Sequence, residues 1–165
     1  MVFLKGVVAY DSVHGSTRTV AEAIAEQIRS EGHEAQLVFI REPVNAPLEG
    51  DILFIGSPTR GGVMTKAAKA FIGLLDGEYW KVRKVITFDT LGPISRDPEK
   101  RRRALSSLND RSKTAANKMK EILENRGIPV HRTMHFAVMG LWGPAAPDAP
   151  ETAKEETHQL LAELS

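Results

Sequence analysis

Three short segments rich in hydroxyl, glycine and proline residues are the parts of this sequence best suited to hold a ligand. They span residues 11–17, 56–62 and 88–93, and each follows a run of apolar residues. The first combines small hydroxyl residues with Gly15 and leads into a helical pattern with no Lys or Arg before Arg18. Free backbone N–H groups and the dipole at a helix N-terminus favour an anion. This segment therefore predicts a phosphate monoester site built from uncharged donors, unlike the loops that end in Gly-Lys-Ser/Thr.

The second and third segments have the composition of turns that let a ligand approach the backbone. Pro58 stiffens the second segment, and Gly61 and Gly62 permit close approach. The third segment reads Phe88-Asp89-Thr90-Leu91-Gly92-Pro93. Each segment alone is equally well explained as an ordinary turn or a capped helix start. Three such segments, each after a separate apolar run, predict a common site.

Five apolar runs alternate with helical patterns and form the elements that must position these segments. Four runs are continuously apolar, as in parallel strands covered on both faces, and lie at 6–10, 51–56, 84–88 and around 136–139. A fifth run at 35–40 reads as a more exposed strand. Apolar spacing of three or four predicts helices at 20–28, 67–75, 115–123 and 153–164, with a weaker turn near 43–48.

The alternation predicts an α/β fold, a doubly wound parallel sheet with helices on both faces. A length of 165 residues, with 42% hydrophobic and 26% charged residues, fits one domain over residues 1–165. Ligands of such sheets bind at the carboxyl ends of the strands, where the three segments fall. Residues 93–111 are long for a strand-to-helix connection, and we interpret them as an insertion with its own helix at about 98–108.

Composition excludes several classes of chemistry. The chain has no cysteine, which excludes disulfides, thiolate nucleophiles and Cys-bound metal centres, and a cytoplasmic location is expected. Lys and Arg total 22 against 21 for Asp and Glu, so no bulk attraction to nucleic acid or membrane is expected. No apolar run is long enough to span a membrane, and the N-terminus reads as a strand without a signal-peptide cleavage pattern.

Three further features are interpreted conservatively. The basic run Arg96–Arg103 lacks the interleaved aromatic residues of nucleic-acid sites and reads first as a solvated helix face. His131 and His135 are four residues apart but have no accompanying carboxylate motif, so no metal site is predicted. Trp80 and Trp142 are predicted to be packing residues.

With their flanks, the three segments resemble the ligand loops of flavodoxins and flavodoxin-like FMN-binding proteins. Residues 12–17 resemble the loop that grips the FMN phosphate, 56–62 the loop against the flavin ring, and 88–90 the loop at the uracil-like edge of the ring. The flanks Val7–Asp11 and Ala21–Ala25 match too, and the likeness covers nearly the whole chain. It implies a five-stranded sheet in the order 2-1-3-4-5 and one non-covalent FMN. The residues implied to contact FMN are Ser12, Val13, His14, Gly15, Ser16, Thr17, Pro58, Thr59, Arg60, Gly61, Gly62, Asp89, Thr90, Leu91 and Gly92.

The resemblance implies an electron carrier that shuttles electrons between protein redox partners, in preference to an enzyme with its own substrate. Two alternatives stay open. Residues Ser57–Arg60 are also similar to those of flavodoxin-like FMN-dependent NAD(P)H:quinone reductases. The other alternative is a flavin-free interaction module with the same fold. The oligomeric state is not indicated.

The sequence departs from flavodoxins in two respects. Arg60 and the pair Thr90–Leu91 stand where flavodoxins usually place ring-stacking aromatics, so the Arg60 guanidinium, the insertion or a partner is expected to cover the ring. Flavodoxins also tend to be strongly acidic, whereas this chain is balanced. If the run Arg96–Arg103 is functional, it suits docking of an acidic redox partner.

Overall fold

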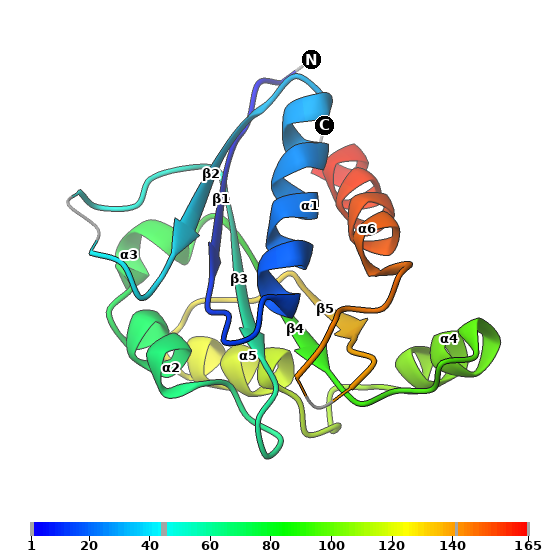
Figure 1. Ribbon diagram of the computed structural model, residues 1–165. Coiled ribbons are helices and arrows are strands. Elements are labelled where there is room, and N and C mark those ends of the chain that lie inside the picture. The colour runs from blue at the N-terminus through cyan, green and yellow to red at the C-terminus, as the bar shows by residue number, and fades with distance from the viewer. Residues whose placement is uncertain (1, 44–45, 141, 165) are drawn as a thin grey trace.

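The computed structural model describes residues 2–43, 46–140 and 142–164, and its core is a five-stranded parallel sheet in the order β2-β1-β3-β4-β5 (Figure 1). This confirms the predicted fold class and strand order. Because the strands are parallel, their carboxyl ends share one edge. The strands are β1 (Lys5–Tyr10), β2 (Glu34–Phe39), β3 (Ile52–Pro58), β4 (Lys84–Leu91) and β5 (Arg132–Ala137).

Helices cover both faces of the sheet, and each face buries its own apolar cluster. Helices α1 and α6 pack together on one face, whereas α2, α3 and α5 cover the other, and α4 lies beyond the edge strand β5 (Figure 1). No helix in the described part of the chain is long and apolar enough to cross a membrane. The helices are α1 (Ser16–Ser30), α2 (Lys66–Gly73), α3 (Gly77–Trp80), α4 (Pro98–Ser106), α5 (Ala115–Asn125) and α6 (Ala149–Leu164).

Two elements differ from the sequence-based expectations. Strand β5 begins at Arg132, earlier than predicted, because this edge strand is only partly buried and shows no continuous apolar run. Helix α3 was not predicted, since the apolar spacing that predicts a helix ends at residue 75, before Asp76 and Gly77. Instead the Asp76 carboxylate accepts hydrogen bonds from the N–H groups of Glu78 and Tyr79 and starts a new turn. The weak helical turn near 43–48 is absent from residues 43 and 46–48, and positions 44–45 lie outside the described residues.

Packing at the centre of the sheet keeps the carboxyl ends of the strands in place. Val20 and Ile24 of α1 are fully buried against the sheet, each contributing about 2 kcal/mol of apolar burial. Gly56 near the end of β3 leaves room for the Phe88 ring, because a Cβ there would lie 2.1 Å from that ring. Strands β3 and β4 are therefore in close contact at their carboxyl ends, where the ligand loops begin.

Candidate functional site

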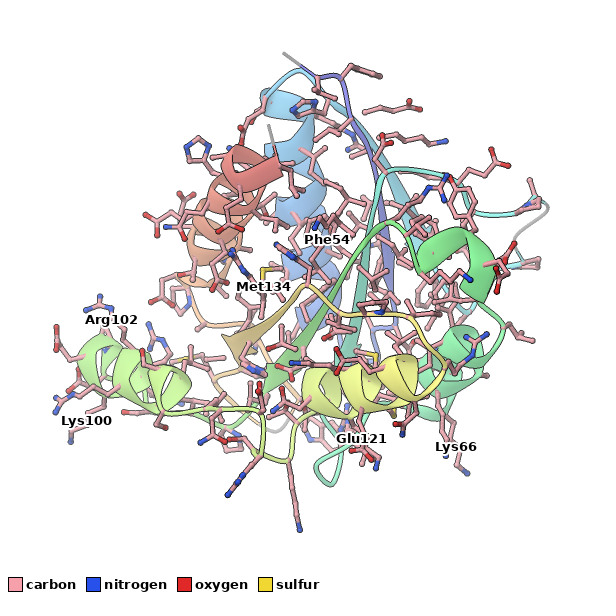
Figure 2. The ribbon with its side chains drawn as sticks, turned by 180° about the vertical axis from the view of Figure 1, so that it is seen from behind. Phe54, Lys66, Lys100, Arg102, Glu121 and Met134 are labelled. Carbon is pink, nitrogen blue, oxygen red and sulfur yellow. The ribbon has the colours of Figure 1, made fainter. Side chains whose placement is uncertain are left out.

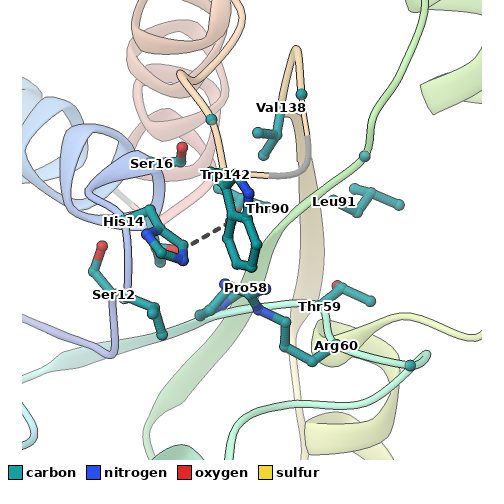
Figure 3. A pocket seen from close by; sticks show the side chains of 16 residues that line it. Ser12, His14, Ser16, Pro58, Thr59, Arg60, Thr90, Leu91, Val138 and Trp142 are labelled. Atoms are coloured by element: carbon teal, nitrogen blue, oxygen red, sulfur yellow. Dashed lines mark hydrogen bonds between the residues drawn. The ribbon is translucent and has the colours of Figure 1, made fainter.

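A cavity of about 310 Å³ lies among the loops at the carboxyl ends of the strands (Figure 3). All three segments singled out in the sequence contribute to it, and the loop after β5 supplies a fourth side. The first segment enters from the start of α1, and the second and third come from the ends of β3 and β4. The lining residues are Ser12, Val13, His14, Ser16, Thr17, Pro58, Thr59, Arg60, Gly61, Thr90, Leu91, Gly92, Val138, Gly140, Trp142 and Gly143.

Three of the predicted contact residues are not among those that line the cavity: Gly15, Gly62 and Asp89. The two glycines shape the loops instead. Gly15 precedes α1 with a φ of 95°, in the left-handed region that favours glycine. Gly62 has a φ of 82°, and a Cβ there would lie 3.1 Å from the Cβ of Lys113. Both positions therefore set the path of the backbone.

The Asp89 side chain makes hydrogen bonds within the fold. It is fully buried, and its carboxylate accepts a hydrogen bond of 2.9 Å from the Ala116 N–H at the start of α5. The same carboxylate lies 3.0 Å from Nδ1 of His135. Burial opposes protonation of His135, but the Asp89 carboxylate outweighs it and raises the His135 pKa. Adjacent strand residues face opposite sides of a sheet, so Thr90 lines the cavity while the Asp89 side chain joins β4 to α5 and β5.

The first loop presents unpaired hydrogen-bond donors at the N-terminus of α1. Gly15 at the N-cap has no side chain to cap this helix, and among the N–H groups of α1 the Ser12 hydroxyl accepts only from that of Arg18, at 3.4 Å. The N–H groups of Ser16 and Thr17 have no acceptor among the described residues. The Ser16 hydroxyl is buried and also lacks a partner there. Gly143 makes room for it, because a Cβ at that position would lie 2.7 Å from Ser16 Oγ. Buried polar groups are normally paired, so these donors indicate a site for an anionic group.

The loops on either side of the cavity are joined by side-chain hydrogen bonds. Thr17 Oγ1 lies 2.8 Å from Thr90 Oγ1, and this hydrogen bond joins the first loop to the third. Asp11, buried just after β1, accepts a hydrogen bond of 2.9 Å from the Ser12 N–H. It also accepts one of 2.6 Å from Arg41 Nε and another from the hydroxyl of Thr65, which precedes α2. These bonds fix the first loop relative to the second.

Arg41 holds Asp11 in its ionised form. Burial alone would raise the pKa of the Asp11 carboxyl, but the hydrogen bonds from Arg41 and Thr65 outweigh burial and lower it. Sequence reasoning included Asp11 in the first segment without a role of its own, and it did not single out Arg41. They are 30 residues apart and meet only because β2 lies beside β1. Knowledge of the strand order was needed to bring them together.

Replacing Asp11 with asparagine is expected to lower the free energy of unfolding of the protein without ligand by about 2 kcal/mol at pH 7. A carboxyl with a lowered folded-state pKa stabilises the fold above its unfolded pKa of about 3.9, and this gain disappears as the pH falls through the folded value. The difference between wild type and Asp11→Asn should therefore shrink below about pH 4. Denaturant unfolding over a pH series measures it, with Asp110→Asn at an exposed residue as control. An equal difference at pH 7 and pH 3 would contradict the assigned role.

The fourth side of the cavity carries an aromatic residue that the sequence analysis misassigned. Trp80 is buried, 1% exposed, and packs in the core as expected, but Trp142 is 60% exposed at the cavity. The Arg60 guanidinium carbon lies 5.7 Å from the centre of the Trp142 ring. The His14 ring meets the same indole edge-on, with 4.5 Å between ring centres (Figure 3). Trp142 therefore adds an aromatic surface between the first and second loops.

The geometry and chemistry of the lining fit FMN. Unpaired donors at α1 suit the phosphate, whereas Trp142 and Arg60 offer flat surfaces for an aromatic ring system. None of the described lining residues is a carboxylate, so nothing among them repels an anion. Among the described residues, no group of three or more His, Asp or Glu side chains is placed to hold a metal ion.

Sequence comparisons identify the family. The family model for the flavodoxin domain matches residues 7–139. A flavodoxin from Aquifex aeolicus (strain VF5) is 37% identical over 78 residues. That match spans 46% of this chain and 42% of the relative, so less than half of either protein is aligned.

Solved structures share the fold across nearly the whole chain. A flavodoxin from the domain Archaea superposes with a TM-score of 0.69 at 16% identity and covers 96% of this chain and 97% of its own. The two-electron reduced flavodoxin of Megasphaera elsdenii gives a TM-score of 0.58 at 19% identity, with 91% and 98% of the two chains covered. At these identities the likeness establishes the fold alone. With the domain match over residues 7–139, the chain belongs to the flavodoxin family.

Proposed function

We propose that the cavity binds FMN non-covalently and that the protein carries electrons between redox partners. The observation that carries this proposal is the buried Ser16 hydroxyl, which, like nearby N–H groups of α1, has no partner among the described residues, in a chain of the flavodoxin family. Bound FMN supplies the redox chemistry by taking up and releasing electrons. The chain itself binds the phosphate at α1 and orients the ring beside Trp142 and Arg60. We also propose a cytoplasmic location, which cell fractionation tests.

An absorption spectrum tests the binding step. The purified protein, or its FMN-free form after addition of FMN, is expected to show a protein-bound flavin spectrum with one FMN per chain. Riboflavin, which lacks the phosphate, should bind more weakly because it cannot use the donors of α1. A protein that takes up no FMN at about 10 µM would contradict the proposal and favour the flavin-free interaction module.

A second candidate is an FMN-dependent NAD(P)H:quinone reductase, favoured by the similarity of Ser57–Arg60 to those enzymes. In the structure, Arg60 stands at the cavity, where a cation can attract the phosphates of a pyridine nucleotide. Rapid oxidation of NAD(P)H by a quinone with no added reductase would assign this activity. A carrier is expected to show only slow turnover in that assay and to depend on a separate reductase.

Trp142 provides an optical report on the ring site. FMN is expected to quench the emission of Trp142, which lines the cavity, while buried Trp80 remains as a constant reference. In Trp142→Phe most of this additional quenching should disappear, and FMN should bind several-fold more weakly, because phenylalanine offers a smaller ring. Fluorescence titration of both proteins with FMN measures both effects. Equal quenching in the two proteins would place the ring away from Trp142.

A further inference from the structure

The chain segment at residues 92–113, which begins and ends beside the cavity loops, carries a concentration of positive charge. It holds seven basic and three acidic residues, in a chain whose net charge is only +1. One end of the segment is at the cavity, because Leu91 and Gly92 are lining residues. The other end returns to the second loop, where Lys113 packs against Gly62 and the Ala115 N–H donates to Thr59 Oγ1 at 3.0 Å. Both ends of the segment therefore lie beside the loops of the cavity.

Buried Arg101 fixes helix α4 in place. Its side chain is 5% exposed and forms an ion pair of 3.1 Å with Asp148, ahead of α6. It also donates to the carbonyls of Ser95 and Arg96, both at 3.2 Å. Figure 2 shows Lys100 and Arg102 extending outward from α4, away from the sheet. The basic face of α4 is thus held in a defined position relative to the cavity.

Most of the cations on this side are not neutralised. Arg102 pairs with Glu99 at 3.2 Å, but both side chains are 70% exposed, so the pair is weak. We define the basic rim as Arg60, which lines the cavity, together with the exposed, unpaired cations of residues 92–113. None of these side chains has a carboxylate partner among the described residues. Its members are Arg60, Arg96, Lys100, Arg103, Arg111 and Lys113.

Exposed apolar side chains lie around the cavity, near Arg60 of the basic rim. Val13 and Trp142 line it and are 48% and 60% exposed. Val63, 40% exposed, is bridged to Arg60 through backbone hydrogen bonds of 2.8 and 3.1 Å. Apolar contacts beside complementary charge suit a short-lived complex, in which charge attracts the partner and the apolar part excludes water at contact.

We propose that this face docks an acidic redox protein, with the basic rim against its carboxylates and its redox centre near the cavity. The proposal rests on the function proposed above, and it names the chemistry of the partner. One electron passes at each encounter, so two one-electron partners oxidise one fully reduced FMN, and the flavin proton is released to solvent. Nucleic acid is disfavoured as the occupant because no array of aromatic residues accompanies the cations of residues 92–113.

A pair of cytochromes c that differ only in surface charge tests the proposal. Native mitochondrial cytochrome c is strongly basic, and succinylation of its lysines makes it acidic. Stopped-flow mixing with the FMN-loaded, reduced protein follows haem reduction over a range of salt concentrations. At low salt we expect the acidic form to react at least about tenfold faster than the basic form, and salt should reduce this difference.

Charge reversal on the chain identifies the surface. Lys100→Glu/Lys113→Glu is expected to slow the acidic cytochrome at low salt by about tenfold and to speed the basic one. Glutamate suits position 100 in the first turn of α4, so the fold is expected to tolerate it. Lys84→Glu, at the opposite end of the sheet, is the control and should change either rate less than about twofold.

The outcomes separate this proposal from the function on which it rests. A protein that binds no FMN reduces neither cytochrome and overturns both proposals. An FMN-loaded protein that reacts faster with the basic cytochrome, or equally with both, overturns the docking surface alone. If the protein forms a dimer that dissociates in high salt and does not form in the double variant, the face binds a second copy of this chain. A DNA duplex that binds wild type but not the double variant would assign it to nucleic acid, and either result overturns the proposal.

Discussion

Replacement of Ser16 with alanine is expected to weaken FMN binding about tenfold to a hundredfold while leaving the affinity for riboflavin unchanged. Ser16 Oγ is a buried group at the cavity with no hydrogen-bond partner in the described protein. A hydrogen bond to a charged group contributes about 1.5–3 kcal/mol, and each 1.4 kcal/mol is a factor of ten in affinity. Because riboflavin has no phosphate, it cannot gain this bond from the hydroxyl.

The stability of the FMN-free protein should respond differently. Removal of a buried polar group that has no partner is neutral or stabilising, and alanine is a better helix former than serine. The FMN-free Ser16→Ala variant should therefore unfold at the same denaturant concentration as wild type, or a higher one. Weaker FMN binding together with unchanged stability would show that the Ser16 hydroxyl makes its hydrogen bond to bound FMN and not within the FMN-free protein.

The matched control for this prediction is Ser30→Ala at the opposite end of the same helix. The Ser30 hydroxyl donates only to the carbonyl of Gln27 in an exposed turn, far from the donors of the α1 N-terminus. Fluorescence titrations with FMN and riboflavin give the four affinities for the two variants. Equal losses for FMN and riboflavin in Ser16→Ala would show that Ser16 shapes the cavity and does not bind phosphate.

Local patterns in the sequence were sufficient for much of the fold. Continuous apolar runs marked β1, β3 and β4 because both faces of these strands are buried. The edge strand β5 has one partner strand and a partly exposed surface, so its start was missed. Trp142 was misassigned for a different reason, because a tryptophan was read as a packing residue wherever it stood. Its residue type does not show that it lines the cavity with 60% of its surface exposed.

The site also depends on contacts that no local pattern contains. Asp89 and Thr90 are neighbours in the sequence, yet one is buried against His135 and the other lines the cavity. The turn-like composition of residues 88–93 predicts that this segment lies at the site. It does not predict which side of the sheet each side chain faces. The contact of Arg60 with Trp142 joins residues from the ends of two separated strands, so it requires the full topology.

Replacement of Arg60 with glutamine is expected to lower the two-electron reduction potential of bound FMN by about 30 mV. Two-electron reduction at neutral pH gives the ring a negative charge, which a nearby guanidinium stabilises and a neutral amide does not. Arg60 is half-buried at the cavity, so its effect is discounted from the buried limit to about 1.4 kcal/mol. For a two-electron couple this energy corresponds to about 30 mV.

Two further substitutions separate the charge of Arg60 from its shape. Arg60→Lys keeps the cation but loses the flat guanidinium that lies over Trp142, so the potential should stay within about 10 mV while FMN binds more weakly. Arg60→Glu places a negative charge at the same point and should lower the potential by about twice as much as glutamine. Spectroelectrochemical titration at low and high salt measures each value.

A thermodynamic cycle links these potentials to binding. A potential lowered by about 30 mV means that the Arg60→Gln protein binds reduced FMN about tenfold more weakly, relative to oxidised FMN, than wild type does. High salt should reduce the difference, because the charge of Arg60 is open to solvent. An unchanged or raised potential in Arg60→Gln would place the ring beyond the reach of Arg60. Such a result would leave phosphate binding at Ser16 intact, since the two effects arise at opposite sides of the cavity.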